Sequence, residues 1–313
     1  MIHPTMNKFT RTLFAPVIKT AEWVGIHNPV LLVKIRYFLR FKKKLNLDAP
    51  CDLNEKILYA KLFTDTSMWA ELFDKYRVRG YVCKCGCSDT LTQLYGSWES
   101  VEDIDFDKLP EAFIFKASNG DGKSQYLVIR NKTEQLNKSR DVILETLRYW
   151  LSRKNVGSLS GEPYLRFVTP RILAEELLPF EENRSSLIDY KIWCINGKVE
   201  YIWTCSDRDE NGTDVMTYDK NWVAHPEYSV FTSRYRRGEL LPKPKNLAGL
   251  IEVAEKLAQP FPCVRVDLYH IDGKIYFGEM TFTSLGGMMD FYTQEFLDLL
   301  GKKIDINSFP KKK

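Results

Sequence analysis

The stretch from Val264 to Phe282 constrains the fold most, because it predicts a β-hairpin with acidic side chains inside its strands. Its sequence is VRVDLYHIDGKIYFGEMTF. Two apolar, β-rich runs flank Asp272-Gly273, and an Asp-Gly pair between such runs is a strong hairpin signal. Asp267 and Glu279 lie at similar depths from this turn, one in each run. Their side chains are therefore expected to converge on one face.

A carboxylate inside a buried strand costs free energy unless another group compensates its charge. Arg265 precedes Asp267 by two residues, and the alternation of a strand places both side chains on the same face. Two carboxylates that converge also repel each other. Mg²⁺ would relieve that repulsion, because it prefers oxygen ligands and shares them with substrate phosphates. These residues alone leave two interpretations: a metal-binding reaction centre, or a structural Arg–Asp–Glu ion-pair network.

A glycine-rich segment, ASNGDGKS, begins at Ala117 and nearly matches the P-loop pattern. Gly122–Ser124 fit its end, but alanine stands where the first glycine belongs. A P-loop opens a helix, whereas the β-rich run QYLVIR follows here. We therefore predict a strand–loop–strand unit. Its glycine backbone can approach phosphates closely, and Lys116 adds a cation on the preceding strand. The alternative is an ordinary hairpin tip.

Other patterns along the chain predict a helical first third and a mixed remainder. Helical spacing of apolar residues covers 8–45, with a break near His27–Pro29, and also covers 52–82. A second hairpin is predicted at 189–207, turning at Asn196-Gly197. Further strands are expected within 91–100, 112–118, 125–130 and 170–178, and further helices at about 133–154, 247–259 and 293–300.

The length and charge of the chain limit its number of lobes and its kinds of partner. A chain of 313 residues predicts two or three lobes. The net charge of +4 excludes general nucleic-acid binding by charge alone, so no nucleic-acid partner is expected. The seven cysteines are scattered, and the Cys83, Cys85 and Cys87 run lacks the second ligand pair of a structural zinc site. We interpret it as a loop or strand of reduced thiols.

Targeting signals are weak, and the start of the chain is basic. No apolar run is long enough to span a bilayer, and the first residues lack a signal-peptide pattern. We expect a cytoplasmic protein.

The segment VLLVKIRYFLRFKKK mixes apolar and basic residues at helical spacing. It is compatible with peripheral contact with the inner membrane surface or an acidic partner, and equally with an ordinary solvated helix face.

Together these motifs resemble the ATP-grasp superfamily, and more particularly its teichuronic-acid (TupA-like) family. The resemblance covers about residue 50 to the end. The segments that carry it are LNEKILYAKL, DKYRVRGYV, FDKLPEAFIFKASNGDG, RILAEELL, DYKIWCINGK, FPCVRVDLY and GKIYFGEMTF.

The resemblance implies an α+β ATP-grasp fold in which two α/β lobes clamp ATP. A basic helical extension at 1–50 and a smaller N-terminal α/β region at 51–110 would come first. The nucleotide lobe with the glycine loop would span 111–180, and the C-terminal catalytic lobe would span 181–313.

The same resemblance implies where ATP binds. Lys116 would contact the α and β phosphates, and the glycine loop would close over the β and γ phosphates. Glu175–Leu178 would form the hinge beside adenine, Asp189 would bind ribose, and Lys191 would reach phosphate or adenine. The implied ATP-binding residues are Lys116, Asn119, Gly120, Gly122, Lys123, Glu175, Glu176, Leu178, Asp189 and Lys191. Asn119 departs from the histidine that relatives tend to carry.

Metal and acceptor residues are implied as well. Asp267 and Glu279 would hold one or two Mg²⁺ ions, with Mn²⁺ as an alternative, and we expect Mg²⁺-ATP to compensate their buried charge. Thr281 stands where many relatives carry an amide ligand. Arg265 would act catalytically with Lys116 by stabilising the oxyanion. The implied acceptor residues are Arg208, Arg265, Ser284, Gly286 and Gly287. An ordinary solvated loop is the alternative for Arg208.

The implied activity is an ATP-dependent carbon–nitrogen ligase that forms an amide through an acyl phosphate. Its partners would be a uronic acid of a bacterial capsular polysaccharide or O-antigen and an amino acid or amine. The roles could be reversed, with an amino sugar as the amine. The alternatives are a nucleotide-sugar glycosyltransferase, for which Asp207–Asp209 is the only metal motif, a sugar kinase, and a non-catalytic binding module.

Overall fold

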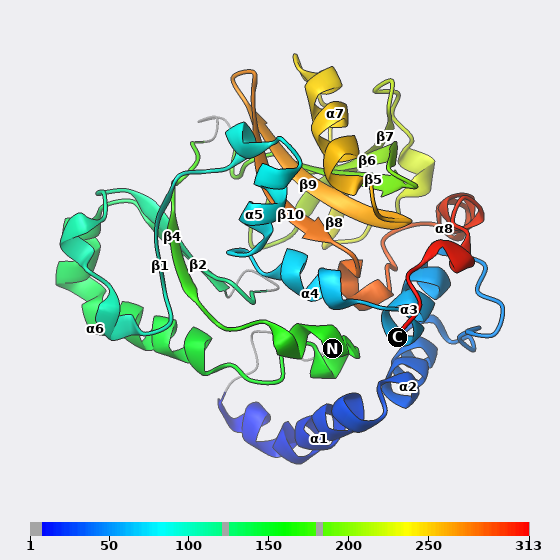
Figure 1. Ribbon diagram of the computed structural model, residues 1–313, viewed down its shortest axis with the longest axis horizontal. Coiled ribbons are helices and arrows are strands. Elements are labelled where there is room, and N and C mark those ends of the chain that lie inside the picture. Colours follow the sequence, from blue (N-terminus) through cyan, green and yellow to red (C-terminus); the bar gives the residue numbers. More distant parts are fainter. Residues whose placement is uncertain (1–7, 121–124, 180–183, 313) are drawn as a thin grey trace.

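The computed structural model describes residues 8–120, 125–179 and 184–312. Within these residues the strands form two sheets (Figure 1). The first has four strands in the order β1-β4-β2-β3, and the second has six in the order β10-β9-β5-β6-β7-β8. The predicted α+β architecture is confirmed.

Two consecutive helices, α1 (Lys8–His27) and α2 (Pro29–Phe41), begin the described chain. The predicted break between them is confirmed and has a local cause. The side chain of Asn28 accepts a hydrogen bond from the Leu31 amide at 3.0 Å, and Pro29 occupies the first helical position. Figure 1 shows both helices, in dark blue, along one edge of the molecule and outside both sheets.

The segment predicted as helical over 52–82 contains three short helices. They are α3 (Leu53–Phe63), α4 (Ser67–Phe73) and α5 (Val78–Lys84). Asp52 caps α3 by accepting from the Glu55 amide at 2.9 Å. The last turn of α5 includes Cys83, and the Cys85 amide still bonds to Tyr81 at 3.0 Å. The interpretation of the cysteine run as a loop or strand is therefore wrong at its start.

The first sheet contains the predicted glycine-loop unit. Its strands are β1 (Leu94–Trp98), β2 (Phe113–Ala117), β3 (Tyr126–Ile129) and β4 (Ile172–Glu175). β2 pairs antiparallel with β3, with Lys116 opposite Tyr126, which confirms the strand–loop–strand prediction. The helix α6 (Lys132–Ser152) packs Leu147 and Trp150 against Phe113 and Phe115. This sheet therefore has its own core.

The second sheet contains both predicted hairpins. Its strands are β5 (Asp189–Ile195), β6 (Lys198–Ser206), β7 (Thr213–Asp219), β8 (Tyr235–Arg237), β9 (Cys263–Ile271) and β10 (Lys274–Thr281). Both turns have positive φ at two successive residues: 51° and 72° at Asn196-Gly197, and 50° and 88° at Asp272-Gly273. That geometry explains the Asx-Gly sequences. The strands β7 and β8 were not predicted.

Two helices complete the second sheet and its surroundings. The helix α7 (Leu247–Ala258) packs against β5, β6 and β9, and α8 (Gln294–Lys302) packs against α3. Short 3₁₀ helices connect the elements at Ser88–Thr90, Val101–Asp103, Phe106–Lys108, Ser158–Ser160, Pro163–Phe167, Pro226–Tyr228, Ser284–Gly287 and Ile306–Ser308. None of the described helices is long and apolar enough to cross a membrane.

The domain boundaries expected from the sequence stay a prediction. One connection between the expected units is visible. β1 comes from the region 51–110, and its residues Leu94–Trp98 pair with β4 in the sheet that carries the glycine loop.

Candidate active site

The carboxylate hairpin brings its polar residues together as the sequence predicts. Glu279 lies directly opposite Asp267, and Thr281 lies opposite Arg265, across β9 and β10. The register shifts between Phe277 and Glu279, which is a β-bulge on the β10 strand. On its other side β9 pairs with β5, where Lys191 lies opposite Asp267.

Arg265 is the centre of this cluster. Its Nε donates to Asp267 Oδ1 at 2.7 Å and its Nη2 to Oδ2 at 2.8 Å, so the pair is bidentate. The Nη2 also reaches Glu279 Oε1 at 3.4 Å and Thr281 Oγ1 at 3.1 Å. The Nη1 donates to Ser284 Oγ at 2.5 Å. One buried guanidinium thus connects both carboxylates with the predicted acceptor segment.

Two basic side chains of the protein form ion pairs with the carboxylate of Asp267. Its side chain is 3% exposed, and it pairs with Lys191 Nζ at 2.5 Å as well as with Arg265. This is the ion-pair arrangement that the sequence left open. Burial still raises the pKa of Asp267 above its ordinary value, although Arg265 and Lys191 oppose that shift, so the expectation that Mg²⁺-ATP compensates this charge stays a prediction. Metal binding by the hairpin stays a prediction.

Glu279 differs from Asp267 in exposure and in its charged surroundings. Its side chain is 44% exposed. Partial burial opposes its ionisation, but the cations of Lys75, Lys191 and Arg265 outweigh that effect and lower the pKa of Glu279 to about 2. Thr281 Oγ1 also donates to Glu279 Oε1 at 3.0 Å. Glu279 is therefore an ionised carboxylate with a face open to solvent.

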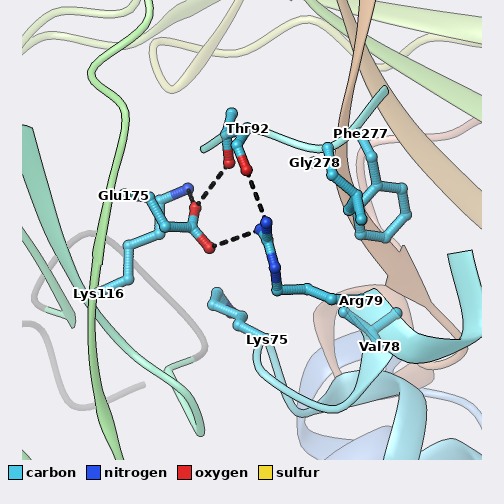
Figure 2. Close-up of a pocket in the computed structure, with 9 residues that line it drawn as sticks. Lys75, Val78, Arg79, Thr92, Lys116, Glu175, Phe277 and Gly278 are labelled. Atoms are coloured by element: carbon cyan, nitrogen blue, oxygen red, sulfur yellow. Dashed lines mark hydrogen bonds and ion pairs between the residues drawn. The ribbon is translucent and has the colours of Figure 1, made fainter. Parts of the chain in front are cut away.

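A small cavity between the two sheets lies beside this cluster (Figure 2). Glu175, at the end of β4, accepts from Lys116 Nζ at 2.8 Å and from Thr92 Oγ1 at 3.2 Å. Arg79 contacts Glu175 Oε1 at 3.4 Å and donates to the Thr92 carbonyl at 2.6 Å. The lining residues are Lys75, Val78, Arg79, Leu91, Thr92, Lys116, Glu175, Phe277 and Gly278.

The sequence analysis assigned no site role to Lys75, Arg79 or Thr92, although Lys75 and Arg79 lie in the segment DKYRVRGYV that carries the resemblance. Lys75 lies in the turn before α5. Its amide donates to the Ser118 carbonyl at 3.1 Å, and its Nζ donates to the Gly120 carbonyl at 2.6 Å. The charge of Lys75 also acts on Glu279. This lysine thus connects the base of the glycine loop with the carboxylate hairpin.

The remaining described residues predicted to bind ATP are not among those that line this cavity. Leu178 is buried, and Glu176 accepts from the Gln93 amide at 3.2 Å. Asn119 is 1% exposed, and its Oδ1 has no hydrogen-bond partner among the described residues. Gly122 and Lys123 lie outside the described residues.

Asp189 joins two basic side chains at the edge of the cluster. Arg208 Nη2 donates to Asp189 Oδ2 at 2.7 Å, and Lys191 Nζ lies 3.7 Å from the same oxygen. Burial would lower the pKa of Lys191, but Asp189 and Asp267 outweigh it and raise that pKa. Arg208 therefore belongs to an ion-pair chain that leads to Asp267, and the interpretation as a purely solvated loop residue is wrong.

The predicted acceptor segment is a 3₁₀ turn, Ser284–Gly287, held from behind by a buried lysine. Gly286 and Gly287 have φ of 67° and 81°, which favours glycine. Lys61 is fully buried, and its Nζ donates to the Gly286 carbonyl at 2.6 Å and to the Ser160 carbonyl at 2.9 Å. The segment is thus fixed next to Arg265.

The donor set at the hairpin matches one kind of metal site. Asp267, Glu279 and Thr281 offer carboxylate and hydroxyl oxygens, the ligand type that Mg²⁺ prefers. Among the described residues no group of three or more His, Cys, Asp or Glu side chains could hold a metal ion. The residues therefore fit an ion that shares its ligands with substrate phosphates, and do not fit a metal held by protein groups alone.

One comparison with known proteins shows the family of this chain. A sequence model described as TupA-like ATPgrasp matches residues 55–305. The fold is similar to that of D-alanine–D-alanine ligase from Bacillus anthracis complexed with ATP, at 15% identity and a TM-score of 0.46, covering 83% of this chain and 69% of that one. It is also similar to N5-carboxyaminoimidazole synthetase from Staphylococcus aureus complexed with ADP, at 12% identity and a TM-score of 0.41, covering 70% and 46%. No curated protein matches. The family match covers most of the chain, and the protein therefore belongs to the TupA-like ATP-grasp family.

Proposed function

We propose that this ATP-grasp protein is an ATP- and Mg²⁺-dependent carboxylate–amine ligase. The observation that carries the proposal is the position of Lys75. It touches the base of the glycine loop through Gly120, lines the inter-sheet cavity, and acts electrostatically on Glu279. A phosphate chain lying along Lys75 would therefore run from the glycine loop toward the carboxylate hairpin.

The charge balance of the cavity supports a polyphosphate ligand. Among the described lining residues, Lys75, Arg79 and Lys116 supply three cations, and Glu175 supplies the only carboxylate. Such an excess of fixed positive charge at a small, partly closed site favours an anion. We assign Lys116 to the α and β phosphates. Asn119, whose buried Oδ1 has no partner among the described residues, has free capacity for a ligand donor.

Adenosine recognition is assigned to the hinge and to β5. Glu175, Glu176 and Leu178 would lie beside adenine, and Asp189 would bind the ribose, with Lys191 reaching phosphate. The loop residues Gly120, Gly122 and Lys123 would close over the terminal phosphates, which excludes water from the reacting atoms.

The reaction proceeds in two displacement steps. A carboxylate oxygen of the first substrate attacks the γ phosphorus, the bond to the β–γ bridging oxygen breaks, and ADP leaves. The amine then attacks the carbonyl carbon of the acyl phosphate, the amine loses a proton, and phosphate departs as the amide forms. Arg265, which is held between Asp267 and Ser284, would stabilise the oxyanion of the second step.

Asp267 and Glu279, with Thr281, would hold the magnesium, whose charge offsets that of the transferring phosphoryl group. The open face of Glu279 is the accessible ligand position. Asp267 is already paired with Arg265 and Lys191, so its first role is to fix these two cations.

The substrates we propose are a uronic acid of a bacterial capsular polysaccharide or O-antigen and an amino acid or amine. Arg208, Ser284, Gly286 and Gly287 would contact the acceptor. Because ATP is the energy source, we place the reaction on the cytoplasmic side of the membrane.

The glycosyltransferase alternative receives no support from its motif. Asp207 accepts from Arg184 at 2.9 Å, and Asp209 accepts from Arg236 at 3.0 Å. Both carboxylates are therefore paired with arginines, as Asp267 is, and neither lines the inter-sheet cavity.

An isotope experiment tests the proposal. Purified protein, Mg²⁺-ATP, a panel of uronic acids labelled with ¹⁸O in the carboxylate, and a panel of amino acids would be incubated together. We expect phosphate carrying one ¹⁸O atom, ADP release that depends on both substrates, and an amide by mass spectrometry. A kinase would leave the phosphoryl group on the sugar. In a parallel incubation that also contains a nucleotide sugar, sugar transfer without ADP release would overturn the ligase proposal.

A further inference from the structure

The helix α2 carries an apolar stripe on its solvent side, which we call the α2 outer face. Its four large side chains are 46–61% exposed and follow the i, i+4, i+7, i+8 spacing of one helix face. They are Leu31, Ile35, Phe38 and Leu39. Large apolar side chains gathered on one exposed face mark an interaction site more often than scattered ones do.

The opposite side of α2 fixes the helix to the body of the protein. Val33 and Tyr37 are fully buried in a core cluster with residues of α3. Arg36 donates to the Leu159 carbonyl, and Arg40 pairs with Asp290 at 2.6 Å. Because these contacts determine the orientation of the helix, the α2 outer face cannot turn inward without breaking them.

The charged residues of α2 and of the segment that follows it are all basic. The sequence contains no aspartate or glutamate between Glu22 and Asp48. Lys34 lies next to the stripe on the same exposed side, and Lys42–Lys44 are exposed at the C-terminal end of α2. A second copy of the chain would place lysines against lysines, whereas an anionic surface complements both the charge and the apolar stripe.

We propose that the α2 outer face binds the surface of a bilayer that contains anionic phospholipid. The apolar stripe would lie at the boundary between headgroups and acyl chains, and Lys34, Lys42 and Lys44 would contact the headgroups. The stripe is short, so neither signal suffices alone. Binding therefore requires both anionic lipid and the apolar side chains.

Vesicle flotation of the full chain tests this proposal. Vesicles of phosphatidylcholine with a quarter phosphatidylglycerol would be compared with pure phosphatidylcholine at low and high salt. We expect binding only to the anionic vesicles, and about tenfold weaker binding at 0.5 M salt, because salt screens surface charge. Equal binding to both vesicle types, or binding to neither, would overturn the proposal. The second of these results would favour an acidic protein partner.

Two variants and a matched control separate the contribution of the apolar side chains to vesicle binding from that of the lysines. The double variant Phe38→Ser, Leu39→Ser and the triple variant Lys34→Gln, Lys42→Gln, Lys44→Gln are each expected to bind anionic vesicles at least about tenfold more weakly. The control Val142→Ser, Tyr149→Ser removes apolar side chains of similar exposure from α6 and should bind as the wild type does.

Unchanged thermal unfolding midpoints would show that each variant is folded. If the α2 variants bind as well as the α6 control does, the assignment of this face is wrong. The assay uses no ATP or sugar, so its outcome is independent of the ligase activity proposed above.

Discussion

The ammonium group of Lys75 donates a hydrogen bond to the carbonyl oxygen of Gly120 at 2.6 Å. Lys75 precedes α5, and Gly120 lies at the base of the glycine loop. This contact ties the loop to the side of the cavity that faces the carboxylate hairpin.

Replacing Lys75 by methionine should impair the use of ATP. Both the contact with Gly120 and the positive charge beside Glu279 disappear. Charge-assisted hydrogen bonds contribute about 1.5–3 kcal/mol, so we expect kcat/KM for ATP to fall roughly tenfold to a hundredfold. Steady-state kinetics would measure this change. Lys138→Met, which removes an exposed lysine paired with Glu134 on α6, should leave kcat/KM unchanged, and equal effects of both variants would contradict the role of Lys75.

The two carboxylates of the hairpin should respond differently to neutralisation. Asp267→Asn leaves Arg265 and Lys191 buried without their shared partner, which should lower the free energy of unfolding by about 3–5 kcal/mol. Chemical denaturation would measure it. Asp209→Asn, which breaks a partly exposed pair with Arg236, should cost about 1 kcal/mol or less. Similar losses of unfolding free energy in the two variants would show that the buried ion pairs of Asp267 stabilise the protein no more than an exposed pair does.

Glu279→Gln should abolish turnover while leaving the protein folded at neutral pH. Glu279 is 44% exposed and makes only one longer contact with Arg265, at 3.4 Å. Titration calorimetry of Mg²⁺-ATP would show weakened metal-dependent binding. Retained activity would remove Glu279 from the metal site.

The ionised Glu279 also predicts a pH dependence of stability. Its pKa is about 2 in the folded protein, below the ordinary value of about 4.3 in an unfolded chain. Its stabilising contribution is therefore complete above the unfolded pKa and is lost as the pH falls from about 4.3 toward 2. The difference in unfolding free energy between wild type and Glu279→Gln should shrink over this window. A constant difference would mean that the pKa is not lowered.

Lys61 predicts a second rise of stability with pH, at alkaline pH and from the loss of a buried positive charge. Burial lowers its pKa from 10.5 to about 8, although Glu162 opposes the change. The unfolded chain therefore holds more protons between these values, and the contribution of Lys61 to stability rises with pH by about 3 kcal/mol across the window. The unfolding free energy of wild type relative to Lys61→Met should rise between pH 8 and 10.5. A flat difference would show that Lys61 does not titrate there.

Local sequence predicted what local backbone chemistry determines. The two Asx-Gly turns require positive φ at successive residues, so both hairpins could be placed. The β-rich residues after Ser124 excluded a P-loop, because a P-loop must be followed by a helix. Alternation then placed Arg265 with Asp267 on one face. In each case the deciding residues lie within a few positions of one another.

Features that depend on distant partners were not predictable in the same way. β8 is a three-residue strand that pairs parallel with β7, and its own residues, Tyr235–Arg237, carry no alternating apolar pattern. Arg79 and Glu175 meet across the cavity, but helical spacing says nothing about which sheet a helix faces. The compensation of Asp267 by Lys191 depends on the pairing of β5 with β9, which no local pattern determines.

The β-bulge in β10 determines which side chain faces Asp267. Lys274 lies opposite Ile271, and a regular ladder continued from that pair would place Gly278 opposite Asp267. The extra residue brings Glu279 there instead. In a regular ladder Glu279 would lie opposite Val266, and its side chain would face away from Arg265 and Asp267. Deleting one residue at the bulge should therefore separate the acidic pair without changing any of its side chains.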